Sequence, residues 1–113
     1  MVGQGDIFFV DFTPSQGHEQ MSRRPALALS NNLVAKTSGM TIVAPISSTQ
    51  RRFPMYYPLG LANKVHGQVL LDQTRALDLR ARKIRDSDIV DHLSKDELEA
   101  IVKLYQLLFS LDD

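Results

Sequence analysis

The chain has 113 residues, of which 43% are hydrophobic, and its 13 basic and 13 acidic side chains give a formal net charge of zero. This length and composition predict one globular domain over residues 1–113, with enough apolar side chain for a core. Cysteine is absent and the three histidines lack a metal-ligand spacing, so we expect neither a metal nor another cofactor. No apolar run is long enough to span a membrane and the start lacks the basic flank of a signal peptide, so we expect a soluble cytoplasmic protein without a membrane partner.

The zero net charge hides a polarity along the chain. Residues 86–113 hold eight acidic and two basic side chains, a charge of −6, which leaves +6 on residues 1–85, from eleven basic and five acidic side chains. Such an asymmetry is typical of a polyanion-binding face. The alternative is that a charged helix merely balances a basic sheet.

In chain order, the first half predicts three strands. Residues 6–12 (DIFFVDF) are β-branched and aromatic and favour a strand. Residues 13–24 are polar and contain Pro and Gly, which indicates a long loop. Residues 25–30 favour a second strand, residues 31–39 a short helical turn, and residues 40–47 a third strand rich in Val and Ile.

The second half predicts two further strands and a helix. A basic loop over 48–54 precedes a weaker strand at 55–59, and residues 66–77 favour one long strand beginning near Gly67, while 79–88 are basic and not assigned. Ser94 and Glu97 form a capping-box pattern before an apolar stripe, which predicts an amphipathic helix over about 95–110. The stripe contains Leu98, Ile101, Val102, Tyr105, Leu108 and Phe109. We expect it to pack on the sheet, with a dimer contact as the alternative. The elements together predict a mainly β (α+β) fold, a small β-barrel with a C-terminal amphipathic α-helix.

The loop before the second strand is unusually rich in chemistry. Residues 17–27 (GHEQMSRRPAL) place an imidazole, a carboxylate, an amide and two guanidinium groups close together, in His18, Glu19, Gln20, Arg23 and Arg24. Long loops in small compact domains are more often functional than idle. We therefore expect this loop to carry a site.

Four sequence blocks resemble one known family. GDIFFVDF, GHEQ-x₃-RPAL, IVAPIS and VLLDQTRALD follow the order and spacing of the MazF/PemK (Kid) family of toxin endoribonucleases, over nearly the whole chain. The resemblance implies an SH3-like barrel, a homodimer, metal-independent cleavage of single-stranded RNA, and neutralisation by a cognate antitoxin.

Under that resemblance, loop 17–24 supplies the groups that RNA cleavage without a metal needs. The 2′-hydroxyl attacks the adjacent phosphate, which requires a proton acceptor, a proton donor and positive charge on the phosphorane. His18 titrates near neutral pH and suits either proton role, and Glu19 is an acceptor. Arg24 matches the family's arginine before the proline and is assigned to the phosphorane, because guanidinium does not deprotonate in proteins. The alternative for Arg24 is a loop-shaping salt bridge to Glu19.

Two more candidates lie outside the loop. Ser47 stands where other members have threonine, and its hydroxyl either binds a phosphate oxygen or caps its own backbone. Asp72 matches an aspartate that some members are thought to use as base; in a strand it must be either paired or functional. Leu70 replaces an arginine proposed as the acid in some members, so a mechanism that needs that arginine does not run unchanged here.

RNA binding is expected from bases beside aromatic rings, which hold single strands by phosphate contacts and stacking. The predicted binding residues are Gln20, Arg23, Ser48, Thr49, Arg51, Arg52, Phe53, Tyr56, Gln73 and Arg75. The alternatives are core packing for the aromatic rings and a structural role for Gln73 and Arg75. A basic stretch at 80–85 either extends the track or is a solvated face, and His66 and His92 are expected to be structural.

The sequence is also compatible with two other functions. The gyrase poison CcdB is similar in fold to the family, but its action depends on a C-terminal tryptophan, whereas this chain has none and ends in FSLDD. The other alternative is an RNA- or protein-binding SH3-like module without catalysis.

Overall fold

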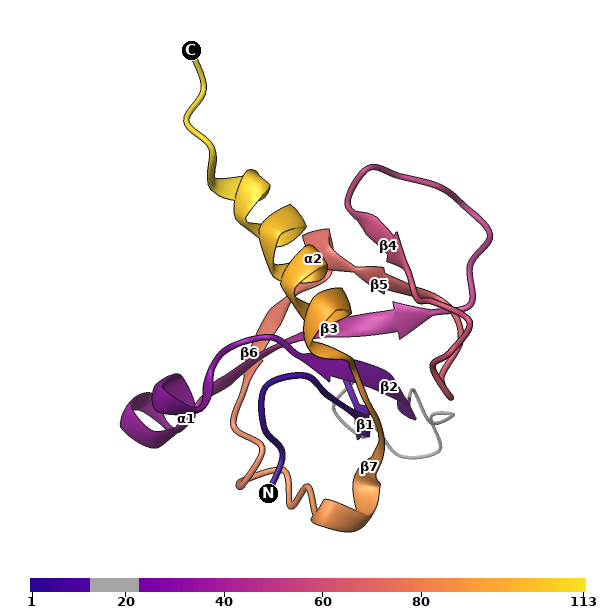
Figure 1. Cartoon of the computed structure of the whole chain (residues 1–113). Coiled ribbons are helices and arrows are strands. Elements are labelled where there is room, and N and C mark those ends of the chain that lie inside the picture. Colours follow the sequence, from indigo (N-terminus) through magenta and orange to yellow (C-terminus); the bar gives the residue numbers. More distant parts are fainter. Residues whose placement is uncertain (13–22) are drawn as a thin grey trace.

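The computed structural model describes residues 1–12 and 23–113, which form short strands, two α-helices and three single turns of 3-10 helix (Figure 1). The strands are β1 (Asp6–Asp11), β2 (Arg23–Ala28), β3 (Thr41–Ser47), β4 (Tyr56–Pro58), β5 (Gln68–Leu70), β6 (Arg75–Leu77) and β7 (Ile89–His92). The α-helices are α1 (Asn32–Ser38) and α2 (Lys95–Gln106), and the 3-10 turns are η1 (Leu71–Gln73), η2 (Asp86–Asp88) and η3 (Leu107–Phe109).

All strands belong to one antiparallel sheet with β3 near its middle. The strand order is β4-β5-β3-β2-β1-β7, and β6 pairs with the first half of β3. The predicted class, mainly β with a C-terminal helix, is confirmed. Among the described strands, the two at the ends of this order, β4 and β7, do not pair with each other, so the sheet remains open rather than closing into a complete barrel.

Four of the predicted strands and the short helix are confirmed within a few residues. Strand β2 begins at Arg23, two residues before the predicted start, so Arg23 and Arg24 belong to a strand and not to the loop that was expected to end with them. Helix α1 is capped by Asn31, whose side chain accepts a hydrogen bond from Val34 N, and ends at Gly39 in a left-handed conformation. Strand β7 was not predicted.

The prediction of one long strand over 66–77 is wrong, because a bulge divides it. Ile46 pairs with Val69 of β5, while Val43, three residues earlier on β3, pairs with Arg75 of β6, six residues after Val69. Six minus three leaves three extra residues, and they form η1. The side chain of Leu71 is fully buried, so the bulge is pinned to the core while Asp72 and Gln73 turn outward and are exposed.

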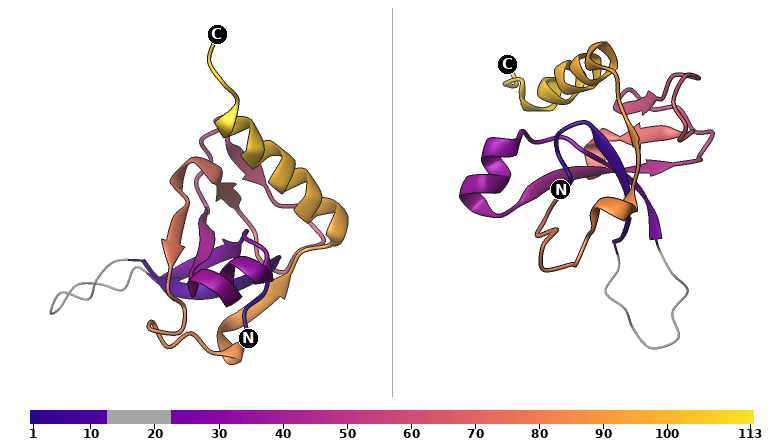
Figure 2. Two further views of the ribbon diagram at one scale, coloured as in Figure 1. Left: turned by 90° about the vertical axis from the view of Figure 1, so that its left-hand side faces the viewer. Right: turned by 60° about the horizontal axis from the view of Figure 1, so that its bottom comes forward.

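Buried side chains form two clusters, because successive residues of a strand point to opposite faces of the sheet. Ile7 and Leu27 belong to the first cluster, and their neighbours Phe8 and Ala26 to the second. Helix α2 covers the first cluster through the buried Ile101, and Figure 2 shows the helix lying along one side of the sheet. Side chains from the 79–89 segment and from Val2 pack against the second cluster.

Helix α2 begins as predicted but uses its capping residues differently. The Ser94 side chain accepts a hydrogen bond from Glu97 N. The Glu97 carboxylate does not complete the box; it accepts from Gly60 N at 2.8 Å and from Asn63 Nδ2 at 2.7 Å, and so ties the 60–63 turn to the helix.

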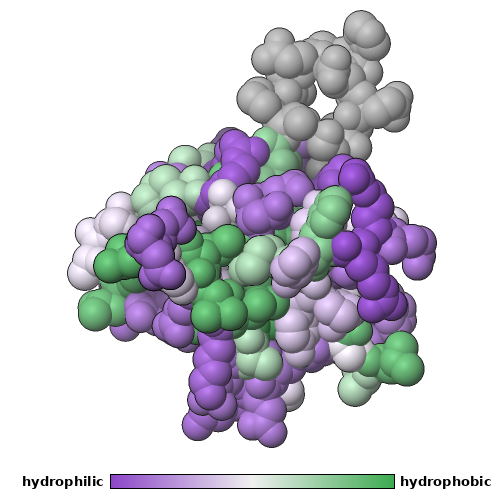
Figure 3. Space-filling view, turned by 90° about the horizontal axis from the view of Figure 1, so that it is seen from above, coloured by the Kyte–Doolittle hydropathy of each residue, from purple (hydrophilic) through white to green (hydrophobic). Residues whose placement is uncertain are grey.

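The far end of the predicted helical stripe is not covered by the rest of the chain that the structure describes. Leu107, Leu108, Phe109 and Leu111 are all exposed and form what we call the C-terminal apolar patch. Figure 3 looks onto this end of the molecule and shows hydrophobic surface (green) beside hydrophilic surface (purple). None of the helices in the described ranges has the length and the apolar content to cross a membrane.

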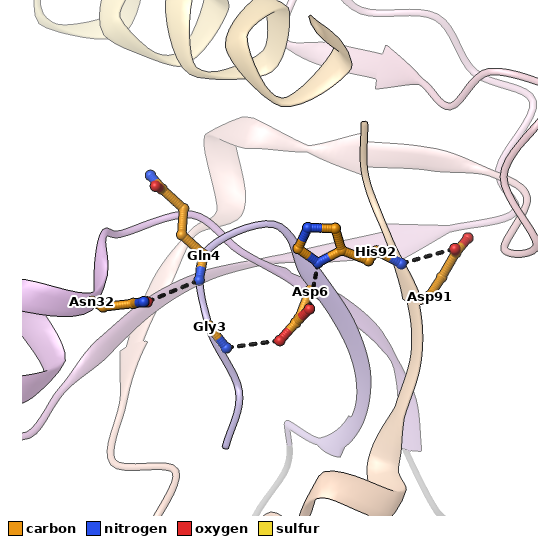
Figure 4. A network of polar contacts seen from close by, with 6 residues as sticks. All are labelled: Gly3, Gln4, Asp6, Asn32, Asp91 and His92. Atoms are coloured by element: carbon orange, nitrogen blue, oxygen red, sulfur yellow. Dashed lines mark hydrogen bonds and ion pairs between the residues drawn. The ribbon is translucent and has the colours of Figure 1, made fainter. Parts of the chain in front are cut away.

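The N-terminal segment is held to β7 and α1 by polar contacts (Figure 4). Nδ1 of His92 lies 2.5 Å from Oδ1 of Asp6, and the other carboxylate oxygen of Asp6 accepts from Gly3 N. Gln4 N donates to the side chain of Asn32. The structural role predicted for His92 is thus explained by a partner that lies 86 residues away in the sequence.

Candidate active site

The two neighbouring arginines of β2 have different surroundings. Arg24 is the cross-strand partner of Val10 and Arg23 that of Asp11, so their side chains lie on opposite faces of the sheet. Nη2 of Arg23 lies 2.8 Å from the Asp88 carboxylate, and its guanidinium lies 5.4 Å from the centre of the Phe9 ring. Arg24 is exposed, and its side chain makes no hydrogen bond or ion pair with another described residue. Of the pair, Arg24 is the one whose donors are not engaged by the described part of the chain.

Arg24 and Ser47 lie toward the same end of the β2–β3 pair. The last pair of this antiparallel ladder is Ala26 with Pro45. Arg24 precedes Ala26 by two residues in β2, and Ser47 follows Pro45 by two residues in β3. Positions two apart in a strand point to the same face, so Arg24 shares the face of Ala26 and Ser47 that of Pro45. Two residues that are 23 positions apart in the sequence are therefore brought to one end of two neighbouring strands.

The hydroxyl oxygen of Ser47 accepts a local hydrogen bond, and its O–H remains able to donate one. Its oxygen accepts a hydrogen bond from Thr49 N at 3.1 Å, which is the backbone-capping alternative that the sequence left open. A serine hydroxyl has one donor and two acceptor positions. Accepting from Thr49 N therefore leaves the O–H free to donate to an oxygen of a bound group, so the two interpretations of Ser47 are compatible.

Gln68, which the sequence analysis did not single out, orders the loop that follows Ser47. Gln68 is the cross-strand partner of Ser47 and is buried. Its Nε2 donates to the carbonyl oxygens of Thr49 at 3.0 Å and Arg51 at 2.7 Å, and Arg51 N donates to Thr49 Oγ1 at 3.2 Å. The signal in the sequence was an amide at the start of an apolar strand, because a buried amide needs partners.

A chain of side-chain contacts runs from this loop to the bulge. The Arg51 guanidinium lies 4.9 Å from the centre of the Phe53 ring, and Phe53 meets Tyr56 edge to face at 5.0 Å. The Tyr56 hydroxyl accepts from Gln73 Nε2 at 3.3 Å. Phe53 is 44% exposed, so this aromatic pair is not core. The arrangement is a surface platform of rings and a guanidinium with an amide at one end.

Asp72 lies beside Gln73 in η1, so the prediction that this acid lies within a strand is wrong. The apolar pattern around Asp72 predicts a strand, where an acid is either paired or functional. In the structure Asp72 is exposed on the bulge, and its carboxylate makes no hydrogen bond or ion pair with a described residue. Leu70, which stands in place of an arginine of some family members, is buried and pairs with Tyr56 across β4 and β5.

Comparisons with known proteins decide the family. The profile of the family described as PemK-like, MazF-like toxin of type II toxin-antitoxin system matches residues 3–109. The chain belongs to this family. The chain is 44% identical over 84 residues to the endoribonuclease toxin ChpB of Escherichia coli, covering 70% of the chain and 72% of ChpB. It is 28% identical over 118 residues to the endoribonuclease EndoA of Bacillus subtilis, covering 100% and 98%.

A solved structure agrees. The MazE–MazF structure (Form-II) from Deinococcus radiodurans superposes with a TM-score of 0.81 at 30% identity and covers 98% of this chain and 97% of that one. The resemblance seen in the four blocks is thereby confirmed, and with it the expected class of enzyme, an endoribonuclease.

In this MazF-like toxin, Arg75 is engaged with the end of β1. Its Nη1 donates to Phe12 O at 2.7 Å, and its guanidinium lies 5.7 Å from the centre of the Phe12 ring. Arg82 donates to Asp11 O at 2.9 Å. These contacts support the structural alternative for Arg75. Its role in RNA binding stays a prediction.

The remaining candidates of the MazF-like toxin divide into two groups. His18, Glu19 and Gln20 lie outside the described residues, so the structure does not report where they stand relative to Arg24. Ser48, Arg51 and Arg52 are exposed on the loop after β3, and Thr49 is half-buried. The structure thus gathers Arg24, Ser47 and the 48–56 loop in adjacent strands and turns, and leaves Arg23 and Arg75 engaged elsewhere.

Proposed function

We propose that this toxin cleaves single-stranded RNA, including mRNA, at specific sequences and without a metal ion. The 2′-hydroxyl oxygen forms a bond to the adjacent phosphorus while the bond from phosphorus to the 5′-oxygen breaks. The products are a 2′,3′-cyclic phosphate and a 5′-hydroxyl end. The observation that carries this proposal is the placement of Arg24 and Ser47 at the same end of the paired strands β2 and β3, with an exposed platform of rings and basic side chains in the loop that follows Ser47.

Arg24 is assigned to the charge that develops on the phosphorane. Its guanidinium is exposed, and its planar fork of donors matches two phosphate oxygens at once. Preorganised donors of this kind stabilise the transition state more than the ground state, because the negative charge grows during the reaction. Ser47 adds a neutral donor next to it, since its oxygen already accepts from Thr49 N and its proton is free.

The proton transfers are assigned to three residues jointly. One group must take the proton of the 2′-hydroxyl, and another must give a proton to the leaving 5′-oxygen. The candidates are His18, Glu19 and Asp72. The exposure of Asp72 supports a role as base, because a carboxylate at the end of the platform is within reach of a substrate that arrives from solvent.

RNA is held by the platform and the loops next to it. Phe53 and Tyr56 offer ring faces or edges for stacking, and Arg51 and Arg52 offer phosphate contacts. Gln73 keeps its side-chain carbonyl available for a base edge, because only its Nε2 is bonded to Tyr56. The further RNA contacts that we propose are Gln20, Arg23, Ser48, Thr49 and Arg75.

We also propose three properties of the protein in its cell. It acts in the cytoplasm, where mRNA is found. A cognate antitoxin neutralises it through an acidic and apolar segment, which complements the +6 charge of residues 1–85. It forms a homodimer; the exposed C-terminal apolar patch supports this, because large apolar side chains that are exposed close together in the chain are typical of an interaction site.

A direct test is incubation with a long single-stranded RNA in excess EDTA. We expect discrete fragments that end in a cyclic phosphate, and a rate of fragment formation lower by about 10²–10³-fold when Arg24 is replaced by alanine. Intact RNA with the wild-type protein, or cleavage only after a divalent metal is restored, would contradict the proposal. Mapping the ends of the fragments gives the recognition sequence.

A further inference from the structure

The bulge between β5 and β6 is tied to the rest of the molecule at three points. The buried Leu71 anchors it to the core, and Leu71 N donates to Met55 O at 3.0 Å. On the side of the platform, Gln73 donates to the Tyr56 hydroxyl. On the opposite side, the Thr74 hydroxyl lies 3.0 Å from the hydroxyl of Tyr105 on α2.

The contact between Thr74 and Tyr105 joins two parts of the chain that the sheet does not connect. Thr74 ends the bulge, just after the two exposed residues Asp72 and Gln73. Tyr105 lies in the last turn of α2, 31 residues later, and both residues are half-buried. A hydrogen bond shielded from water in this way restrains its partners more than one on an open surface.

Tyr105 is itself held in a defined position. Its ring packs against the first core cluster, and it meets the Phe109 ring at 5.4 Å and 87°, an edge-to-face contact. Tyrosine has few rotatable bonds, so a ring fixed at two sides presents its hydroxyl in one place. The helix therefore offers Thr74 a stationary partner.

We propose that Tyr105, acting through Thr74, is a positioning residue for RNA cleavage. The pair fixes the bulge so that Asp72 and Gln73 stand in register with Tyr56 and Phe53, at the end of the platform. The inference rests on the proposed function, because it concerns the geometry of that same site. Catalytic groups need placement within about 0.5 Å, so a loosened bulge lowers turnover even when the fold is intact.

The test uses hydroxyl deletions that keep the shape of each side chain. We expect Tyr105→Phe and Thr74→Val each to lower kcat for RNA cleavage about fivefold, the factor that corresponds to one net hydrogen bond, with KM little changed. The double variant should lose no more than either single variant, because both remove the same contact. Thr74→Ser retains a hydroxyl and should cleave at the wild-type rate.

Tyr57→Phe is the matched control. Tyr57 also packs against the first core cluster, but among the described residues its hydroxyl makes no hydrogen bond to the bulge. It should leave kcat unchanged, and thermal unfolding of all the variants should show that each remains folded at the assay temperature.

Two results separate this inference from the function it rests on. If the wild-type protein leaves RNA intact, the proposed function fails. If the wild-type protein cuts RNA, the inference is overturned when Tyr105→Phe and Thr74→Val cut equally fast, when their losses add in the double variant, or when Tyr57→Phe loses as much as Tyr105→Phe.

Discussion

Asp88 at the end of η2 receives two partners, the guanidinium of Arg23 at 2.8 Å and the backbone N–H of Arg85 at 2.8 Å. The carboxylate therefore links the first residue of β2 to the turn that precedes β7. Arg23 also lies over the Phe9 ring, so its side chain is occupied on one face of the sheet. Arg24 points to the other face, so the two adjacent arginines have separate surroundings.

Replacement of these arginines should separate catalysis from structure. Arg24→Ala should lower kcat about 10²–10³-fold, or roughly 3–4 kcal/mol of transition-state stabilisation, with a smaller effect on KM. Arg24→Lys should recover little of the rate, because an ammonium retains the charge without the two-pronged geometry. Steady-state cleavage of a short RNA with a fluorescent reporter measures both constants.

Arg23→Ala is the control for that experiment. It removes a half-exposed ion pair and should lower the free energy of unfolding by only about 0.5–1 kcal/mol, with kcat close to wild type. If Arg23→Ala abolished cleavage while Arg24→Ala cut at the normal rate, the assignment of the two arginines would be reversed.

The two functions proposed for the Ser47 hydroxyl can be tested by one pair of variants. Ser47→Ala removes both the acceptor for Thr49 N and the donor for phosphate, whereas Ser47→Thr retains both. We expect the alanine variant to lose about tenfold or more in kcat, as for the loss of one hydrogen bond to a charged group, and the threonine variant to remain active. Equal activity of Ser47→Ala and wild type would remove Ser47 from the mechanism.

Gly67 is the glycine whose replacement the site should tolerate least. Its φ is +131°, and a β-carbon there would come within 2.5 Å of the Ser47 carbonyl oxygen, which belongs to the backbone. Gly67→Ala should therefore destabilise the fold by about 2–4 kcal/mol and displace β3 at Ser47.

Gly39→Ala is the matched comparison for that variant. Its φ is +77°, but nothing lies within 4 Å of the added carbon, so only the backbone strain of about 1 kcal/mol remains. Chemical denaturation of both variants measures the difference. Equal stability of the two would show that the close approach of Gly67 to Ser47 does not constrain the sheet.

Asp91 should make stability depend on acid pH. Burial acts to raise the pKa of its carboxyl, but hydrogen bonds from the backbone N–H groups of His92, Val65 and Lys64, with the charge of Lys64, more than offset this and lower the pKa. A lowered folded-state pKa means that the contribution is complete above the unfolded value of about 3.9 and is lost as pH falls through the folded value.

Urea denaturation at pH 6 and pH 3 tests this. Asp91→Asn should be less stable than wild type at pH 6 and should lose less stability on acidification, because its side chain no longer takes up a proton. Asp112→Asn, a change in the exposed C-terminal tail, should follow the wild-type curve. Parallel curves for Asp91→Asn and wild type would refute the role of Asp91.

Local patterns were sufficient to predict most of the elements, but not the pairing of strands. Strand β1 and helix α2 have clear periodicity and were predicted well. The 66–77 segment has the composition of a strand throughout, and the three extra residues of η1 become visible only when both halves are paired with β3. Strand β7 is four residues long and polar at His92, so its neighbour β1 and not its own pattern defines it.

In the candidate site, too, the sequence was sufficient for local features but not for contacts between distant residues. The type of each residue indicated its chemistry, as for Arg24 and Ser47. Which donors are already occupied depends on contacts across long sequence separations, such as Arg23 with Asp88 over 65 residues and Arg75 with Phe12 over 63. Gln68 was overlooked because its partners are backbone carbonyl groups, which carry no signature in the sequence.

The central claim is that the substrate's own 2′-hydroxyl is the nucleophile, activated beside Arg24 and Ser47. The most direct measurement is cleavage of two oligonucleotides that differ only in one sugar, ribose or deoxyribose, on the nucleotide just 5′ of the mapped cut. We predict that the deoxyribose oligonucleotide binds with nearly unchanged affinity, because phosphate contacts and stacking remain, and is not cut at that position. Cleavage of it at that position would contradict the mechanism.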